Sequence, residues 1–288
     1  MDNLRQIIKS AEKNKVAIGH FNISDLTALK AIFEAAEELN VPVIIGTSQG
    51  EADFLDRKEA VALVKTLREE NNFPIFLNAD HAHSFEEVKE AVEAGYDAVL
   101  FDAGKLSLDE NIRQTKKAVE LAKSINPEVL VEGELGYIGD SSKILQKMPE
   151  GAAIKPGDLT SPEDAKRFAE ETGIDLLATA VGNIHGMFKD MPNPALDISR
   201  IKGIKEVVNI PLVLHGGSGI SDDDFKKAIE AGISVIHINT ELRIAWRKGM
   251  EEGLKDNPEE IAPYKVLPEA VAEIKEVVYN RLKLFNRL

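Results

Sequence analysis

The chain has 288 residues and no cysteine, so disulfides, thiolate catalysis and thiolate metal ligands are excluded. Its net charge is −14, from 35 basic and 49 acidic residues, which argues against nucleic acid as a partner. Apolar residues make up 43% of the sequence, but no run of them would span a membrane and none opens the chain as a signal segment. We therefore expect a cytoplasmic protein that is not bound to membranes and uses His, Asp or Glu for any metal.

Strand-like and helix-like segments alternate along the whole chain. The predicted strands cover 16–22, 41–48, 74–80, 97–102, 129–136, 175–181, 211–214 and 234–239. A helical pattern at 2–14 precedes them, and another follows Pro258. A (β/α)₈ barrel needs about 250 residues, so one barrel fits with a little left over. We predict an α/β fold: a single (β/α)₈ TIM barrel domain over 1–288, with an additional N-terminal helix and a C-terminal helical tail.

Helix-start signals support this order. Serines stand at four expected helix starts: Ser24, Ser84, Ser161 and Ser221. Glu87 completes a capping box with Ser84, and Pro162 takes the first helical position after Ser161. The segment 137–157 has no clear element, and a loop of that length in a barrel is typically functional.

Polar residues follow the carboxyl ends of the strands, which converge on one mouth in a barrel. They are Asn22, Ser48, Asp80, His81, Asp102, Glu132, Glu134, His185, His215 and Asn239. Three imidazoles with an open position are typical of a catalytic zinc site, and His81, His185 and His215 end three different strands. Asp80 would act as acid and base beside the metal, with its side chain diverging from that of His81. We expect His20 and His83 to be structural.

The same mouth offers two places for phosphate. The turn Gly216-Gly217-Ser218-Gly219 precedes a helix start, and Asn239-Thr240 opens another helix, so both leave backbone N–H groups free for an anion. Gly186 and Lys189 follow the sixth strand. A metal between two anion sites predicts a sugar phosphate or ketose bisphosphate as substrate.

Four motifs together resemble one family. They are Ala79-Asp80-His81, Val131-Glu132-Gly133-Glu134-Leu135-Gly136, Gly182-Asn183-Ile184-His185-Gly186 and Leu214-His215-Gly216-Gly217-Ser218-Gly219. The chain resembles, from Gly19 to Glu241, the class II (zinc-dependent) fructose-bisphosphate aldolases of the ketose-bisphosphate aldolase family. The resemblance implies a lyase that cleaves fructose 1,6-bisphosphate to dihydroxyacetone phosphate and glyceraldehyde 3-phosphate. Tagatose 1,6-bisphosphate or another phosphorylated ketose is the alternative.

The resemblance also implies residue roles. His81, His185 and His215 would bind zinc, Glu132 would be an alternative or second-site metal ligand, and Asp80 would move the proton of the C4 hydroxyl. Further residues would hold phosphate or line the substrate site: Asn22, Ser48, Gly186, Lys189, Gly216, Gly217, Ser218, Asn239 and Thr240. A monovalent cation (Na⁺ or K⁺) near the phosphate and a homodimer or homotetramer are also implied.

The sequence departs from the family pattern at three places. His237 stands where the family usually has a substrate-contacting Asn, and would be a substitute donor or a sign of changed specificity. The third strand ends in 78–83, Asn-Ala-Asp-His-Ala-His, rather than the usual Leu-Asp-His. The loop carries 140–143, Asp-Ser-Ser-Lys, where relatives often have Glu; Asp140 or Glu150 would take over the second proton transfer.

Two functions of other classes fit the same features. A metal hydrolase on this barrel would use zinc-bound water, and a non-catalytic sugar-phosphate binder would keep only the fold. Retention of Asp80 with the three histidines argues against the binder. A Schiff-base aldolase is disfavoured because no Lys stands at a predicted strand end. Cobalt, iron or nickel would also suit three imidazoles.

Overall fold

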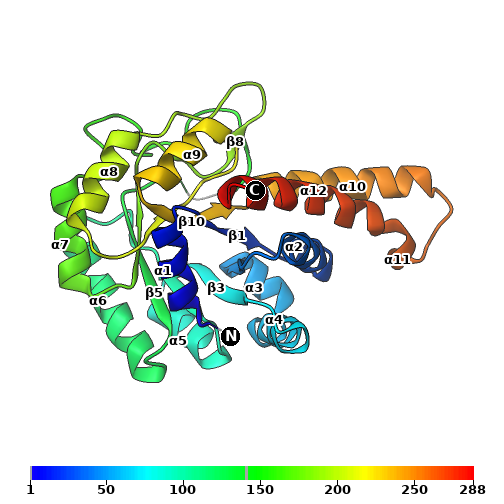
Figure 1. The fold of residues 1–288 in the computed structure, drawn as a ribbon, viewed down its shortest axis with the longest axis horizontal. Helices are drawn as coiled ribbons and strands as arrows, with labels where there is room; N and C mark the ends of the chain where they lie inside the picture. Colours follow the sequence, from blue (N-terminus) through cyan, green and yellow to red (C-terminus); the bar gives the residue numbers. More distant parts are fainter. Residues whose placement is uncertain (1, 140–141) are drawn as a thin grey trace.

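Eight parallel strands close into a barrel in the computed structural model, which describes residues 2–139 and 142–288 (Figure 1). Around the barrel the strands follow the order β1-β10-β9-β7-β5-β4-β3-β2. Their bounds are β1 Ile18–Asn22, β2 Val43–Ser48, β3 Ile75–Ala82, β4 Ala98–Phe101, β5 Leu130–Leu135, β7 Leu176–Thr179, β9 Leu212–Leu214 and β10 Ile233–Ile238. The predicted (β/α)₈ architecture is confirmed.

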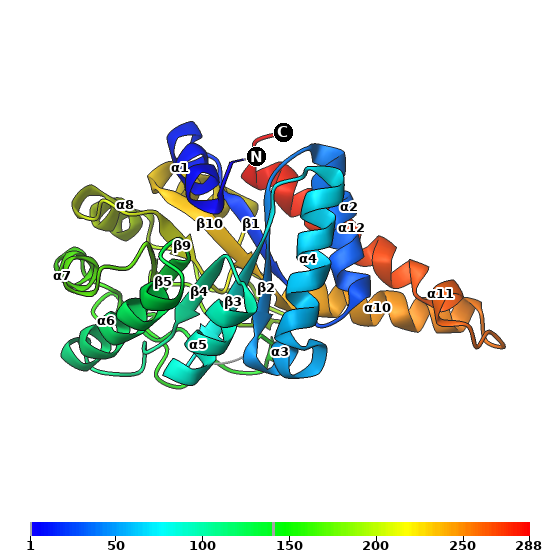
Figure 2. The same cartoon turned by 90° about the horizontal axis from the view of Figure 1, so that it is seen from below.

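Helices cover the outside of the barrel. They are α2 Leu26–Leu39, α3 Gln49–Leu55, α4 Arg57–Asn71, α5 Phe85–Ala94, α6 Leu108–Ile125, α7 Pro162–Thr172, α8 Ile198–Val207 and α9 Asp222–Ala231. Three more helices follow: α10 Thr240–Asp256, α11 Pro263–Val266 and α12 Pro268–Phe285. The hairpin of α10 and α12 projects away from the barrel, with α11 at its tip (Figures 1 and 2). Within the described residues, no helix combines the length and apolarity that a membrane crossing requires.

The helix α1 (Leu4–Asn14) explains why only one end of the barrel is open. Its Leu4, Ile8 and Ala11 pack with inward-facing side chains such as Ile18 and Phe76, and together they form a buried cluster at the amino ends of the strands. Burying this apolar face closes that end of the barrel. The polar residues at the carboxyl ends of the strands are therefore left around the single open mouth.

Local differences from the predicted elements have identifiable causes. Asp25, not Ser24, caps α2, because its Oδ1 accepts from the Ala28 N–H at 2.8 Å. The helix predicted over 57–70 is preceded by α3, and the two are separated at Asp56, whose φ is 67°. The predicted caps Ser84, Ser161 and Ser221 are confirmed.

The long loop after β5 contains one short strand that the sequence did not indicate. This strand, β6 (Ile144–Leu145), pairs in parallel with β8 (Met187–Phe188), which follows β7. Two residues are too few for a periodic signal, so the pairing depends on contacts between distant segments. It joins the two loops that border the mouth.

Close packing in the α10–α12 hairpin gives a stability prediction. A Cβ at Gly249 would lie 2.6 Å from both the Glu269 carbonyl oxygen and the Ala270 nitrogen, and backbone atoms cannot rotate away. We expect Gly249→Ala to lower the free energy of unfolding by about 1–3 kcal/mol, although Ala favours helix by about 1 kcal/mol. Urea unfolding checks this. Gly203→Ala in α8 is the control, because its nearest neighbour atom is 3.4 Å away and only the propensity gain should remain.

Candidate active site

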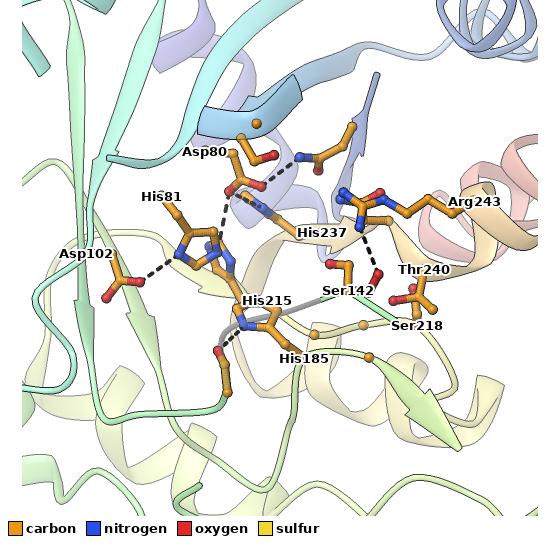
Figure 3. A pocket seen from close by; sticks show the side chains of 18 of the residues that line it. Asp80, His81, Asp102, Ser142, His185, His215, Ser218, His237, Thr240 and Arg243 are labelled. Atoms are coloured by element: carbon orange, nitrogen blue, oxygen red, sulfur yellow. Dashed lines mark hydrogen bonds and ion pairs between the residues drawn. The ribbon is translucent and has the colours of Figure 1, made fainter. Parts of the chain in front are cut away.

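A pocket of about 280 Å³ opens at the carboxyl ends of the barrel strands (Figure 3). Most sequence-predicted site residues line it: Asn22, Ser48, Asp80, His81, His185, Gly186, His215, Gly216, Gly217, Ser218, His237, Asn239 and Thr240. Two predicted residues do not. Glu132 lies beneath the pocket against His215, and Lys189 is an exposed residue outside the lining.

Asp80 and His81 face the pocket together, although they are consecutive in the chain. Alternation along a strand would send them to opposite sides, and we predicted that they diverge. That prediction is wrong, because His81 has a φ of 59° and the pairing of β3 with β4 shifts register between Ala79 and Ala82. The left-handed conformation costs a non-glycine residue of order 1–3 kcal/mol and is typical of functional sites. It brings Asp80 Oδ1 to 3.7 Å from His81 Nε2.

Each of three histidines has one ring nitrogen held by an acceptor. His81 Nδ1 donates to Asp102 Oδ2 at 2.9 Å, and His185 Nδ1 donates to the Gly139 carbonyl at 2.7 Å. His215 Nε2 donates to Glu132 Oε1 at 2.8 Å. Because these acceptors fix an N–H on one nitrogen, the neutral form of each ring has its lone pair on the other.

The three rings offer those lone pairs to one place. Candidate ligand atoms of His81, His185 and His215 all lie within 4.8 Å of one another. The Nδ1 atom of His215 is buried and has no hydrogen-bond partner. An orphaned buried nitrogen beside two further imidazoles, each held by an acceptor at its other nitrogen, is the donor set that a divalent transition metal requires. The residues present therefore fit a metal ion.

Buried acidic side chains surround His81 in this part of the pocket. Burial alone would lower the pKa of His81, but Asp80, Asp102 and Glu134 outweigh it and raise the pKa to about 10. Burial raises the pKa of Glu134 well above its usual range, with Asp102 adding to the effect. The His185 pKa falls to about 3, because that ring is buried beside His81 and His215. A cation is the species that such surroundings favour.

Asp80 is the carboxylate placed for proton transfer. Its Oδ2 accepts from Asn22 Nδ2 at 2.8 Å, while its buried Oδ1 has no hydrogen-bond partner. Burial would raise the Asp80 pKa, but the charge of His81 and the contact with His237 hold it well below the usual range. Asp80 is thus an ionised base with one oxygen fixed and the other free to accept a proton.

His237 is supported from behind by His20. The two rings stack with centroids 3.5 Å apart and an interplanar angle of 6°, and His237 Nδ1 lies 3.4 Å from Asp80 Oδ1. A Cβ on Gly46 would lie 2.7 Å from His20 Nε2, so the stack needs glycine there. Burial lowers the pKa of His237 well below its usual value, and that of His20 to about 4. Neutral rings of this kind shape the pocket wall beside Asp80.

The glycine turn after β9 lies against the loop after β7. Gly216 has a φ of 61°, and a Cβ there would lie 2.6 Å from the Ile184 carbonyl carbon, so the approach requires glycine. Ser218 Oγ accepts from the Glu241 N–H at 3.2 Å, which ties the turn to the first turn of α10. The turn and Thr240, the first residue of α10, together form the wall where an anion is expected.

Three charged residues at the site had no assigned role in our sequence interpretation. Asp102 orients His81, Glu51 lies under the rim, and Arg243 reaches the pocket from the second turn of α10. The capping-box spacing from Ser48 to Glu51 was the one signal for Glu51. No sequence signal pointed to Arg243, because an arginine is ordinary inside a polar helix. Glu150, suggested for proton transfer, is exposed, and Asp140 lies outside the described residues.

Known proteins match both the sequence and the fold. The family described as "Fructose-bisphosphate aldolase class-II" matches residues 2–287. The fructose-bisphosphate aldolase of Geobacillus stearothermophilus is 36% identical over 288 residues, covering 99% of this chain and 96% of that one. The enzyme of that name from Thermus caldophilus is 35% identical over 304 residues, covering 98% and 96%. The crystal structure of the YdjI aldolase from Escherichia coli K12 superposes with a TM-score of 0.80 at 31% identity, covering 99% and 96%.

The barrel and its histidine site define an aldolase, a lyase that uses a divalent metal ion and acts on phosphorylated sugars. The chain belongs to the class II fructose-bisphosphate aldolase family. Its predicted fold class and family are thereby confirmed.

Proposed function

We propose that this protein is a zinc-dependent aldolase that cleaves a ketose phosphate between C3 and C4, releasing dihydroxyacetone phosphate and an aldehyde. One observation carries the proposal: three imidazoles, each oriented by an acceptor, converge beside the ionised carboxylate of Asp80. Relatives named fructose-bisphosphate aldolase make fructose 1,6-bisphosphate the first substrate to test. Tagatose 1,6-bisphosphate, which differs at one stereocentre, is the alternative.

His81, His185 and His215 would hold the metal. When bound, the ion supplies electrostatic stabilisation for the negative charge that develops on the dihydroxyacetone phosphate half. Three imidazole ligands favour zinc, although other divalent transition metals suit them as well. The predicted monovalent cation, the homo-oligomeric state and the cytoplasmic location also stand as proposals.

Asp80 begins the cleavage. Its Oδ1 accepts the proton of the C4 hydroxyl; the O–H electron pair forms the carbonyl of the aldehyde, and the C3–C4 bond breaks. The electrons of that bond pass to the dihydroxyacetone phosphate half, and C3 then takes up a proton from solvent, which completes that product. Asn22 keeps the Asp80 carboxylate from rotating, because it holds Oδ2 at 2.8 Å. In the direction of synthesis the same carboxyl returns its proton to the new hydroxyl.

The phosphate of the dihydroxyacetone phosphate half would bind at Gly186, Gly216, Gly217, Ser218 and Thr240. Helix N-terminal N–H groups and a glycine turn suit this anion. The resemblance also assigns Asn239 and Lys189 to the phosphate. The side-chain amide of Asn239 instead donates to Glu51 Oε1 at 3.3 Å, and Lys189 is exposed outside the pocket, so our proposal does not rest on them.

Glu132 would act by orienting His215 rather than as the metal ligand that the resemblance suggested. Its Oε1 accepts the His215 Nε2 proton at 2.8 Å and so fixes Nδ1 toward the metal position. We expect Glu132→Gln to weaken zinc binding by about 10–100-fold. Competition with a fluorescent zinc chelator measures this. If Glu132 ligates the metal directly, kcat of the fully loaded variant should also collapse; an orienting role leaves most of kcat.

The proposed function is tested by the cleavage of fructose 1,6-bisphosphate, followed as triose phosphates in a coupled reduction. Activity that disappears with chelator and returns with zinc supports it. A metal hydrolase would release inorganic phosphate and no triose phosphate. If folded, zinc-loaded protein cleaves neither fructose nor tagatose bisphosphate, and also fails to exchange a carbon-bound proton of dihydroxyacetone phosphate with D₂O, the aldolase proposal is overturned.

A further inference from the structure

The buried carboxylate of Glu51, at the rim of the pocket, collects five hydrogen bonds. Its Oε2 accepts from Asn22 Nδ2, from the Ser48 N–H and from Ser48 Oγ, each at 2.8 Å. Its Oε1 accepts from Arg243 Nη2 at 2.7 Å and from Asn239 Nδ2 at 3.3 Å. A capping box needs only the bond from the Ser48 N–H. The remaining bonds come from side chains that line the pocket.

These bonds place Glu51 next to the part of the substrate beyond C4. The Asn22 amide donates both to Asp80 Oδ2 and to Glu51 Oε2, at 2.8 Å each, so it bridges the two carboxylates. Asp80 acts on the C4 hydroxyl in the proposed function. We therefore assign the groups on the far side of Asn22 to the aldehyde half.

The aldehyde end of the pocket has little positive charge to offer. Among the described residues that line the pocket, Arg243 is the sole Lys or Arg. Its guanidinium is paired with Glu51, and its Nη1 donates to the Ser142 carbonyl at 2.8 Å (Figure 3). A phosphate monoester carries about −1.5 to −2 charges near neutral pH. A second phosphate would lie beside the buried Glu51 carboxylate and would meet donors that already have an acceptor, and juxtaposed like charges disfavour its binding.

We propose that Glu51 is a specificity-determining residue that selects an uncharged, hydroxylated aldehyde half. The preferred substrate is then a ketose monophosphate whose only phosphate lies on the dihydroxyacetone phosphate half. The carboxylate holds Asn22, Ser48 and Asn239 in place while it disfavours a second phosphate. This inference rests on the proposed aldolase function and narrows its substrate class.

The test runs the reaction in the direction of synthesis with a matched pair of aldehydes. Zinc-loaded protein condenses dihydroxyacetone phosphate with D-glyceraldehyde or with D-glyceraldehyde 3-phosphate, which differ only by the phosphate. Native protein should show the higher kcat/KM with D-glyceraldehyde. Glu51→Gln, which removes the charge but keeps the shape, should shift the ratio toward the phosphorylated aldehyde by at least about tenfold. Glu171→Gln, which breaks a Glu–Arg pair on α7, is the matched control and should leave the ratio unchanged.

Failure of the inference is separable from failure of the proposed function. Exchange of a dihydroxyacetone phosphate proton with D₂O, followed by NMR, requires no aldehyde and reports on aldolase chemistry alone. If exchange occurs, the inference is overturned by a higher native kcat/KM for the phosphorylated aldehyde or by condensation with neither. The inference is also overturned if Glu51→Gln shifts the ratio of kcat/KM for the two aldehydes no further than Glu171→Gln does. If Glu51→Gln does not fold, the ratio of kcat/KM for the two aldehydes in the native protein alone decides whether the inference stands.

Discussion

Replacing Asp80 with alanine is expected to lower kcat for cleavage by roughly 10²–10⁴-fold, the usual contribution of a positioned acid–base group. The physical reason is that Asp80 Oδ1 is buried, unpartnered and ionised beside the reacting hydroxyl, and no solvent molecule would be held as well. Asp80 is not needed to hold the metal, so zinc content should stay at the native level. Steady-state cleavage together with metal analysis of the same sample checks both statements.

The Asp80 variants also separate the two halves of the reaction. Asp80 acts at C4, so proton exchange on dihydroxyacetone phosphate should survive in Asp80→Asn while cleavage is lost. Asp109→Asn, on an exposed residue of α6, makes the same chemical change away from the mouth and should behave as native. Cleavage by Asp80→Ala within a few-fold of native, or zinc loss in both Asp80 variants, would contradict the assigned role.

Much of the scaffold could be predicted because its signals are local. Buried apolar runs bounded by turn residues marked the barrel strands, and the Ser84–Glu87 capping box marked its helix to the residue. The role of α1 as the lid of the closed end was not predictable, because it depends on inward-facing residues from all around the barrel. The β6–β8 pair is likewise a contact between two loops, with no periodicity in either.

The candidate site, like the scaffold, has parts that the sequence predicts and parts that it does not. His81, His185 and His215 could be expected to meet because strand ends converge in a barrel. The shared orientation of Asp80 and His81 depends on a register shift and one positive φ, which alternation cannot anticipate. The stack of His20 on His237 follows from their being neighbours in the β1–β10 register. The Glu51 cluster joins residues up to 192 positions apart, so sequence spacing signals its Ser48–Glu51 capping box and none of its long-range contacts.

Removing one imidazole is expected to abolish metal binding and, with it, activity. His185 is the best choice, because its Nδ1 donates to a backbone carbonyl, whereas His81 and His215 each donate a hydrogen bond to a buried carboxylate. Replacing either of the latter would leave an unpaired buried carboxylate and destabilise the fold. We expect His185→Ala to bind zinc more than about 100-fold more weakly, since even loss of a ligand's hydrogen-bond partner costs 10–100-fold.

Thermal unfolding with and without zinc distinguishes loss of the metal from loss of the fold. Zinc at about 1,000 times its Kd should stabilise the native protein by about 4 kcal/mol, because it binds only the folded chain. His185→Ala should unfold at the same temperature as chelated native protein and gain little from zinc, because its remaining two imidazoles hold the ion weakly. If the variant is stabilised by zinc as much as the native protein is, His185 does not hold the metal. A variant that is already unfolded in chelator would assign His185 to the fold instead.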